Sequence, residues 1–113
     1  MTQEEKQLLL KDLCARLPYE VMMKVSHLSH PIALDEFVLF TIKTGREEGI
    51  PYLRPMSSMT KEERKIYMEI GSHLCGEIVA KTMIDWLNEH HFDYRDLIEK
   101  GLALEAPEGM YKI

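Results

Sequence analysis

Apolar residues at the start of the chain are spaced for a helix. Leucines recur at every fourth position, at Leu9, Leu13 and Leu17. This spacing places them on one side of a helix, and Thr2 with Glu5 three residues later has the pattern of a capping box. We therefore predict an amphipathic helix over about residues 3–16. Pro18 should end it, because the residue before a proline is pushed out of the α region.

Segments with the composition of strands follow this helix. We predict strands over Val21–Val25, Glu36–Lys43 and Ile50–Leu53. The second of them, EFVLFTIK, is rich in β-branched and aromatic residues and apolar on both faces, which is typical of a strand with cover on each side. Pro51 and Pro55 should confine the third strand to a sheet edge, because proline cannot donate to a ladder. The pattern does not place residues 26–35, and TGREEG (44–49) should be an exposed turn.

A helix is predicted just after the middle of the chain. Thr60 and Glu63 form a second capping box ahead of a run with helical periodicity. The helix should cover about residues 61–70 and end at Gly71, because glycine favours the position that closes a helix. Its inner face should consist of Ile66, Tyr67 and Ile70.

The pattern is helical again from Ser72. At about 100° per residue, one side of this helix gathers Cys75, Val79, Met83, Trp86, Leu87 and His90. An alternative makes residues 77–84 (EIVAKTMI) a strand, with the helix starting at Asp85. Periodicity alone does not exclude that alternative, although the helix fits the pattern better.

The next boundary between elements falls at Asp93. This residue is a good N-cap, and Phe92 before it can pack on Leu97 as a hydrophobic staple. A helix should follow over about residues 94–100, with Gly101 as the left-handed residue of a Schellman ending. The last twelve residues, LALEAPEGMYKI, are broken by proline and glycine and should pack as an extended strap.

Together these elements predict an α+β fold in a single domain over residues 1–113. It has an amino-terminal helix, a small antiparallel sheet of two to four strands within about residues 19–54, and carboxy-terminal helices. The predicted core draws on both halves of the chain and comprises Leu9, Leu13, Val38, Phe40, Trp86, Leu87, Phe92 and Leu97.

Composition and charge narrow the classes of protein. The 113 residues are 45% hydrophobic and 29% charged, as in an ordinary globular domain. A formal net charge of −5 argues against a nucleic-acid partner, which needs a concentrated basic patch. The chain has neither the pattern of a signal peptide nor the ~20 apolar residues of a membrane span, so we expect a cytoplasmic protein with no membrane partner. Cys14 and Cys75 should be buried thiols in a reducing compartment.

Three strings are more specific than this general pattern. They are LLLKDLCARLPY (8–19), PYLRPMSSMT (51–60) and WLNEHHFDYRDLIEKGLALEAPEGMY (86–111). With them the chain resembles a family of small uncharacterised proteins of gut bacteria, often found in mobile or phage-derived gene neighbourhoods. The family has no assigned activity, so the resemblance carries over no catalytic residue. It implies a bacterial cytoplasmic accessory protein with an α+β fold.

The clearest candidate for chemistry is the cluster of His90, His91 and Asp93. Histidine and carboxylate side chains suit zinc or another transition metal, and Cys75 or His73 could join them through space. Neighbouring helical residues point about 100° apart, however, so both imidazoles rarely reach one ion. The alternative is structural, with His90 on the apolar face, His91 in solvent and Asp93 as an N-cap.

Other candidates are each matched by a structural alternative. His27 and His30, beside Ser26 and Ser29, lack the glycine-rich turn of a nucleophilic site and fit a polar connector. Three residues are candidates for binding, Arg54, Tyr94 and Arg95; Arg54 could instead pair with Glu62 or Glu63. Six of the methionines are either core filler or an adaptable surface, namely Met22, Met23, Met56, Met59, Met68 and Met83.

The sequence therefore predicts no cofactor and no bound metal, and it favours a binding protein over an enzyme. The leading hypothesis is a non-catalytic protein-interaction or regulatory module that binds an unknown protein partner or self-associates as a homo-oligomer. The rival is a metal-binding protein or small hydrolase that uses His90, His91 and Asp93.

Overall fold

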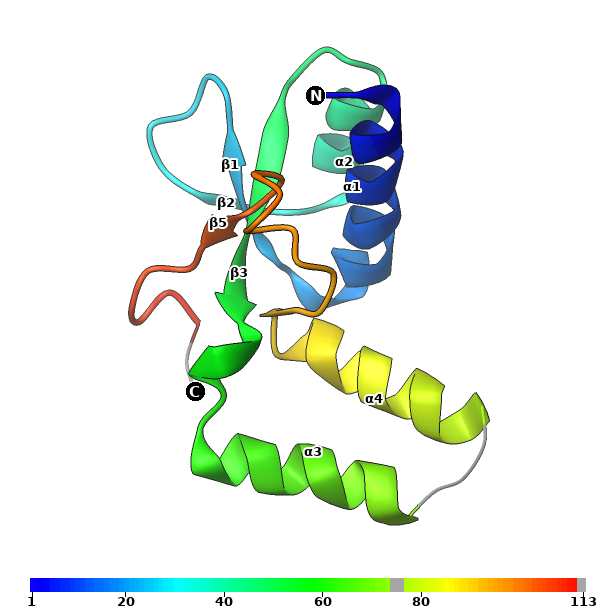
Figure 1. Cartoon of the computed structure of the whole chain (residues 1–113). Coiled ribbons are helices and arrows are strands. Elements are labelled where there is room, and N and C mark those ends of the chain that lie inside the picture. The colour runs from blue at the N-terminus through cyan, green and yellow to red at the C-terminus, as the bar shows by residue number, and fades with distance from the viewer. Residues whose placement is uncertain (74–76, 112–113) are drawn as a thin grey trace.

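An amino-terminal helix, a mixed sheet and a helical hairpin make up the α+β fold in Figure 1. The computed structural model describes residues 1–73 and 77–111, with the backbone alone for His73 and Glu77. Its elements in chain order are α1 (Gln3–Arg16), η1 (Leu17–Tyr19), β1 (Met22–Val25), β2 (Ile32–Ala33), α2 (Glu36–Lys43), β3 (Gly49–Pro55), η2 (Met56–Ser58), α3 (Lys61–His73), α4 (Glu77–Glu89), β4 (Phe92–Asp93) and β5 (Leu104–Glu105). Among the described residues, no helix is long and apolar enough to cross a membrane.

Helix α1 has the predicted bounds and the predicted cap. The Thr2 N–H donates to Glu5 Oε1 at 3.0 Å, and the Glu5 N–H donates to Thr2 Oγ1 at 3.1 Å. The reason given for its end was wrong, because Leu17 has helical angles (φ −51°, ψ −42°) although it precedes Pro18. The chain instead tightens into the 3₁₀ helix η1, where proline needs no amide proton. It leaves η1 at Glu20, which is left-handed at φ 55°.

The sheet is larger than predicted and mixed in direction. Its order is β2-β1-β3-β4, and β5 also pairs with β3. The predicted antiparallel part is present, since β1 runs antiparallel to both β2 and β3. Strands β4 and β5 run parallel to β3. Strand β3 is therefore central, and its assignment to a sheet edge was wrong.

Alternation along β3 explains why its prolines do not confine it to an edge. Neighbouring residues of a strand direct their backbone groups to opposite sides. The Arg54 N–H donates to the His91 carbonyl at 2.8 Å, so even-numbered residues face β4; the Leu53 carbonyl accepts a bond from the segment after β5, so odd-numbered residues face β5. Pro51 and Pro55 are odd-numbered, so they face the side of β5, which pairs with Tyr52 and Leu53. The missing amide protons therefore remove no bond to β1 or β4.

The segment EFVLFTIK is helix α2, so its prediction as a strand was wrong. Asp35 caps the helix by accepting the Val38 N–H at 2.8 Å. Val38 and Ile42, four residues apart, form its buried stripe. Phe37 and Phe40 are 73% and 52% exposed, so Phe40 does not belong to the core as predicted. The apolar pattern on both faces thus combines one buried helical stripe with two exposed phenylalanines.

The core lies between the sheet and the two amino-terminal helices, which lie beside it in Figure 1. Of the predicted core residues, Leu9, Leu13, Val38, Leu87, Phe92 and Leu97 are buried. Trp86 is only partly buried, and its ring stacks on the Phe92 ring with centroids 5.8 Å apart. The core prediction was therefore largely correct, with Phe40 as its clear error.

Helices α3 and α4 form an antiparallel hairpin that projects from the sheet (Figure 1), and we call it the α3–α4 arm. Residues 77–84 are helical, as preferred over a strand. The predicted end at Gly71 was wrong, because α3 continues to His73. A Cβ on Gly71 would lie 3.5 Å from Met83 Cε, so this glycine faces the partner helix of the arm.

The segment after α4 contains turns where a helix over residues 94–100 was predicted. Asp96 is left-handed at φ 58°, which a right-handed helix does not allow. Asp93 still acts as a cap: its Oδ1 accepts the Leu97 N–H at 2.9 Å. The Schellman ending is also present, since Gly101 has φ 76° and the next N–H donates to the Leu97 carbonyl at 2.8 Å. The following strap pairs with β3 as strand β5.

Candidate functional sites

Arg54, predicted as a possible contact residue, forms a buried ion pair instead. Its two terminal nitrogens donate to Glu63 Oε2 at 2.8 Å and to Oε1 at 2.7 Å. Glu63 also completes the capping box of α3 with Thr60. Hydrogen bonds from the Arg54 guanidinium are the main cause that lowers the pKa of Glu63 to about 2. Of the two acidic partners suggested by the sequence, Glu63 is thus the one that Arg54 binds, which ties β3 to the base of the arm.

The side chains of His90, His91 and Asp93 do not converge. The His90 ring packs on Trp86 with centroids 4.3 Å apart, and the His91 ring stacks on Tyr111 at 3.9 Å. The Asp93 carboxylate is occupied by backbone N–H groups of the following turn. Within residues 1–72 and 78–111, no group of three or more His, Cys, Asp or Glu side chains could hold a metal ion. The predicted third ligands, His73 and Cys75, lie outside the described side chains.

His91 has an unusual backbone and an unusual environment. It is left-handed at φ 64°, and its N–H donates to the Asn88 carbonyl at 3.1 Å as α4 ends. Its Nδ1 is buried and has no hydrogen-bond partner among the described residues. Burial first, and then the charge of Arg16, lower the pKa of His91 to about 4. The imidazole is therefore neutral near pH 7.

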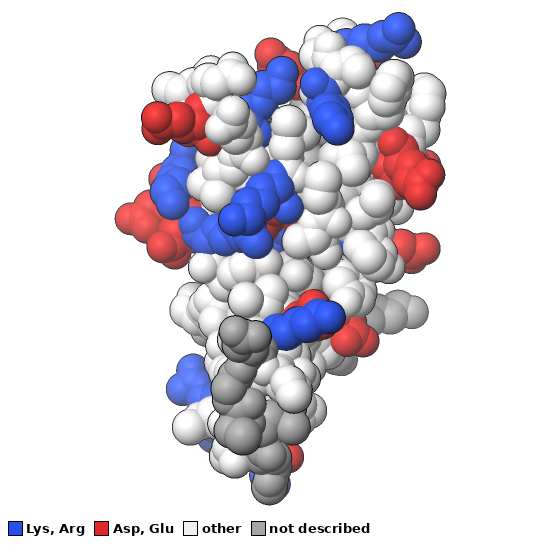
Figure 2. Space-filling model, turned by 90° about the vertical axis from the view of Figure 1, so that its right-hand side faces the viewer, with Lys and Arg blue, Asp and Glu red and all other residues white. Residues whose placement is uncertain are grey.

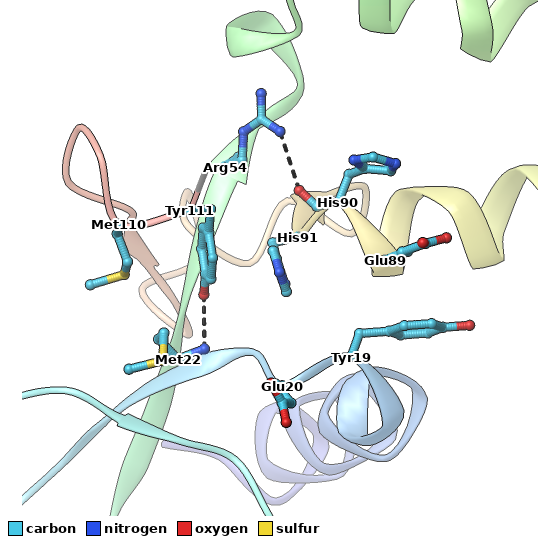
Figure 3. A pocket seen from close by; sticks show the side chains of 9 residues that line it. All are labelled: Tyr19, Glu20, Met22, Arg54, Glu89, His90, His91, Met110 and Tyr111. Atoms are coloured by element: carbon cyan, nitrogen blue, oxygen red, sulfur yellow. Dashed lines mark hydrogen bonds between the residues drawn. The ribbon is translucent and has the colours of Figure 1, made fainter. Parts of the chain in front are cut away.

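A pocket of about 300 Å³ opens beside His91. Its walls come from the η1–β1 junction (Tyr19, Glu20, Met22), from the end of α4 and the residues after it (Glu89, His90, His91), from Arg54 in β3 and from the last residues described (Met110, Tyr111). In Figure 3 the His91 and Tyr111 rings lie side by side, and His91 points toward the turn that carries Tyr19 and Glu20. The pocket thus brings together segments from both ends of the chain.

Tyr111 connects two strands at the wall of this pocket. The pairing of Met23 with Pro51 makes Met22 and Tyr52 the next pair in register. The Tyr111 hydroxyl joins two backbone groups of this pair: it accepts the Met22 N–H at 2.8 Å and donates to the Tyr52 carbonyl at 2.7 Å. Burial raises the pKa of this hydroxyl to about 12. One side chain therefore bridges the point where β1 and β3 separate.

The other two binding candidates, Tyr94 and Arg95, join a buried network. The Tyr94 hydroxyl donates to Asn88 Oδ1 at 2.9 Å, and Arg95 Nε lies 3.6 Å from Asp12 Oδ1. Asp12 is fully buried, and its Oδ2 accepts a hydrogen bond from Arg16 Nε at 2.7 Å. Sequence reasoning missed this pair, although its signal is present: Asp12 and Arg16 are four residues apart on a helix whose inner face contains Leu9 and Leu13.

The remaining candidates lie apart from these sites. His27 and His30 are exposed in the loop between β1 and β2, and His27 Nε2 lies 3.3 Å from Glu47 Oε2. Cys14 is a free, exposed thiol, so the prediction that it is buried was wrong. Of the methionines, Met23 is fully buried and Met68 is 66% exposed. Some of the six therefore fill the core and others lie on the surface.

Exposed large apolar side chains are concentrated on the arm. Four of them belong to it: Ile66 (47% exposed), Met68 (66%), Ile78 (67%) and Ile84 (42%). On the face shown in Figure 2, several Lys and Arg side chains lie across the upper part, with Asp and Glu side chains mostly toward its margins.

Comparison of the chain with protein-family models finds no match, and comparisons with curated proteins and with solved structures find none either. The resemblance to small gut-bacterial proteins therefore stays a prediction, and the function must be argued from the pocket, the buried networks and the arm.

Proposed function

We propose that the chain is a non-catalytic protein-interaction module whose contact surface is the α3–α4 arm. The observation that supports it is the set of isoleucine and methionine side chains that the arm presents to solvent. Apolar surface of this kind is typical of sites that another protein covers. The exposed free thiol of Cys14 favours a reducing compartment, so we place the module in the cytoplasm.

The partner should contact the arm on more than one side. Ile66 and Met68 are two positions apart on α3, so they point about 200° apart around the helix axis. A flat surface covers only one of them. A groove with apolar walls covers both, in the manner of a helix laid into a hydrophobic groove. We therefore favour a partner protein with an apolar groove over a second copy of this chain.

The base of the arm is held in place before any partner binds. Glu63 at the start of α3 accepts two bonds from Arg54 in β3, and Trp86 near the end of α4 stacks on Phe92. A surface that is already ordered loses less conformational entropy on binding than a flexible one. This supports a role for the arm as a preformed ligand.

Site-specific photo-cross-linking in cells tests the proposal. A photoreactive amino acid is placed at Ile66 in one variant and at Met68 in another, with Lys11, exposed on α1, as the control position. We expect both arm positions to capture the same protein and the control position to capture none of it. The complex, reconstituted from purified proteins, should weaken at least tenfold with Met68→Lys, because a buried charge is costly, and stay unchanged with Glu62→Lys.

Two results would overturn the proposal. Capture of the chain by itself alone, together with a dimer in light scattering, would replace the groove-bearing partner by self-association. Capture from Met68 but not from Ile66 would refute a groove that covers both sides of α3.

A further inference from the structure

The pocket beside His91 is separate from the exposed apolar surface of the arm and has a different chemistry. Two carboxylates lie at its walls, Glu20 and Glu89, and neither belongs to an ion pair among the described residues. The cation in the wall, Arg54, has its charge balanced by both oxygens of Glu63. His91 adds no positive charge, because its low pKa keeps it neutral near pH 7. The formal charge of the side chains that line the pocket is therefore negative, although the charges of Arg16 and Arg54 also reach His91.

Aromatic and thioether groups complete the walls. The stacked pair of His91 and Tyr111 forms one side, with an angle of 19° between the rings. Tyr19 lies at another side, where Figure 3 shows it extending in the same direction as Glu89. Ring faces attract cations, and the attraction grows when the cation is partly desolvated. Met22 and Met110 add polarizable, apolar surface suited to an alkyl chain.

The backbone at the pocket is strained at two points. Glu20 and His91 are both left-handed without being glycine, at φ 55° and 64°. Such a conformation costs roughly 1–2 kcal/mol per residue for an ordinary side chain. Strain of this kind collects at binding and catalytic sites, where the surrounding structure holds it. Here it concerns the backbone of Glu20 and of His91, two residues that line the same cavity.

We propose that this pocket binds an organic cation, an ammonium or guanidinium group on a short alkyl chain, between the carboxylates of Glu20 and Glu89 and the rings of Tyr19, His91 and Tyr111. A volume of about 300 Å³ matches a ligand of this size. A lysine or arginine side chain of another protein and a free diamine share this chemistry. The proposal does not depend on the arm, whose exposed side chains lie outside the pocket.

Titration followed by NMR tests it on the full chain. The probes are N-acetyl-lysine amide and N-acetyl-arginine amide for a protein side chain, 1,4-diaminobutane for a free diamine, and N-acetyl-norleucine amide as the uncharged control. We expect the cationic probes to shift the ring signals of His91 and Tyr111, with the norleucine probe at least tenfold weaker. Tighter binding of the amino-acid amides would identify a protein side chain as the source, and tighter binding of the diamine would identify a free amine.

Matched variants separate the pocket from general charge effects. Glu89→Gln should weaken the cationic probes about tenfold, the scale of one charge-assisted hydrogen bond. Glu62→Gln removes the same charge from an exposed position on α3 and should leave binding unchanged. Equal shifts with the norleucine probe, equal losses in the two variants, or no shift with any cationic probe would each overturn the proposal. Met68→Lys on the arm should not alter the titration, so failure here is distinct from failure of the arm.

Discussion

Single glycines in this chain serve opposite purposes. Gly71 lies inside α3, where a Cβ would make ordinary contact with Met83 at 3.5 Å. Gly101 is left-handed at φ 76° and closes the turn after Asp93. The first position therefore tolerates a side chain and the second does not, although both were predicted to end helices.

A pair of alanine substitutions tests this difference. Gly71→Ala should raise the free energy of unfolding by about 0.5–1 kcal/mol, because alanine loses less backbone entropy in a helix. Gly101→Ala should lower it by about 1 kcal/mol, because alanine is strained at positive φ. Urea denaturation measures both. If Gly71→Ala were the more destabilising of the two, the continuation of α3 through Gly71 would be wrong.

At the residue scale, local features were the predictable ones. Both capping boxes follow from side chains three positions apart, which the sequence displays directly. The role of Gly71, by contrast, depends on Met83 in another helix. A neighbour in space decides this feature, so spacing along the chain could not reveal it.

Strand β3 is the element on which the sheet depends, since β1, β4 and β5 all pair with it. At Tyr52 the hydroxyl of Tyr111 adds a side-chain link between β3 and β1. The carboxy-terminal strap is therefore part of the sheet, through both β5 and this hydroxyl.

Removal of one oxygen tests this role of the strap. Tyr111→Phe deletes two hydrogen bonds and leaves the Met22 N–H and the Tyr52 carbonyl without partners, at a cost of about 1–3 kcal/mol. The expected local result is faster hydrogen exchange of the Met22 amide. Tyr19→Phe, at the same pocket, is the control and should leave that exchange rate unchanged. An equal rate in Tyr111→Phe and the unsubstituted chain would contradict the bridging role.

Whether a segment is a helix or a strand was predictable only where the pattern of its own residues determines it. Helix α1 and the helical state of residues 77–84 follow from periodicity over three or more turns. The eight residues of α2 are too few to distinguish a short helix from a strand, and the decisive feature is the cap by Asp35. Strands β4 and β5 have two residues each and exist only because β3 lies beside them.

At the scale of the whole molecule, the lowered pKa values of His91 and Glu63 make the free energy of unfolding depend on pH. Folding lowers the pKa of His91 from 6.5 to about 4, so below pH 6.5 the unfolded chain binds a proton that the folded chain does not. Stability is then lost as pH falls from about 6.5 to 4. Glu63, whose pKa is lowered from 4.5 to about 2, adds a second loss as pH falls from about 4.5 to 2.

Denaturation at a series of pH values measures these losses. The His91 loss should amount to about 1–2 kcal/mol, allowing for the solvent that reaches its ring. In His91→Asn, which retains a residue that tolerates positive φ, the slope between pH 6.5 and 4 should flatten by that amount. His30→Asn, at an exposed histidine, should leave the slope unchanged. Equal slopes in the two variants would rule out His91 as the source.

The Tyr111 bridge also bears on how the chain folds during synthesis. Strands β1 and β3 are translated long before Tyr111, and they can begin to pair at Lys24 and Ile50 as soon as both are available. The bridge between the Met22 N–H and the Tyr52 carbonyl forms later, because it needs the hydroxyl of Tyr111, and strands β4 and β5 are also translated after β3. A nascent chain thus contains a partly paired hairpin with unpaired backbone N–H and C=O groups, the type of intermediate that chaperones recognise. The native sheet is completed only after the strap has been synthesised.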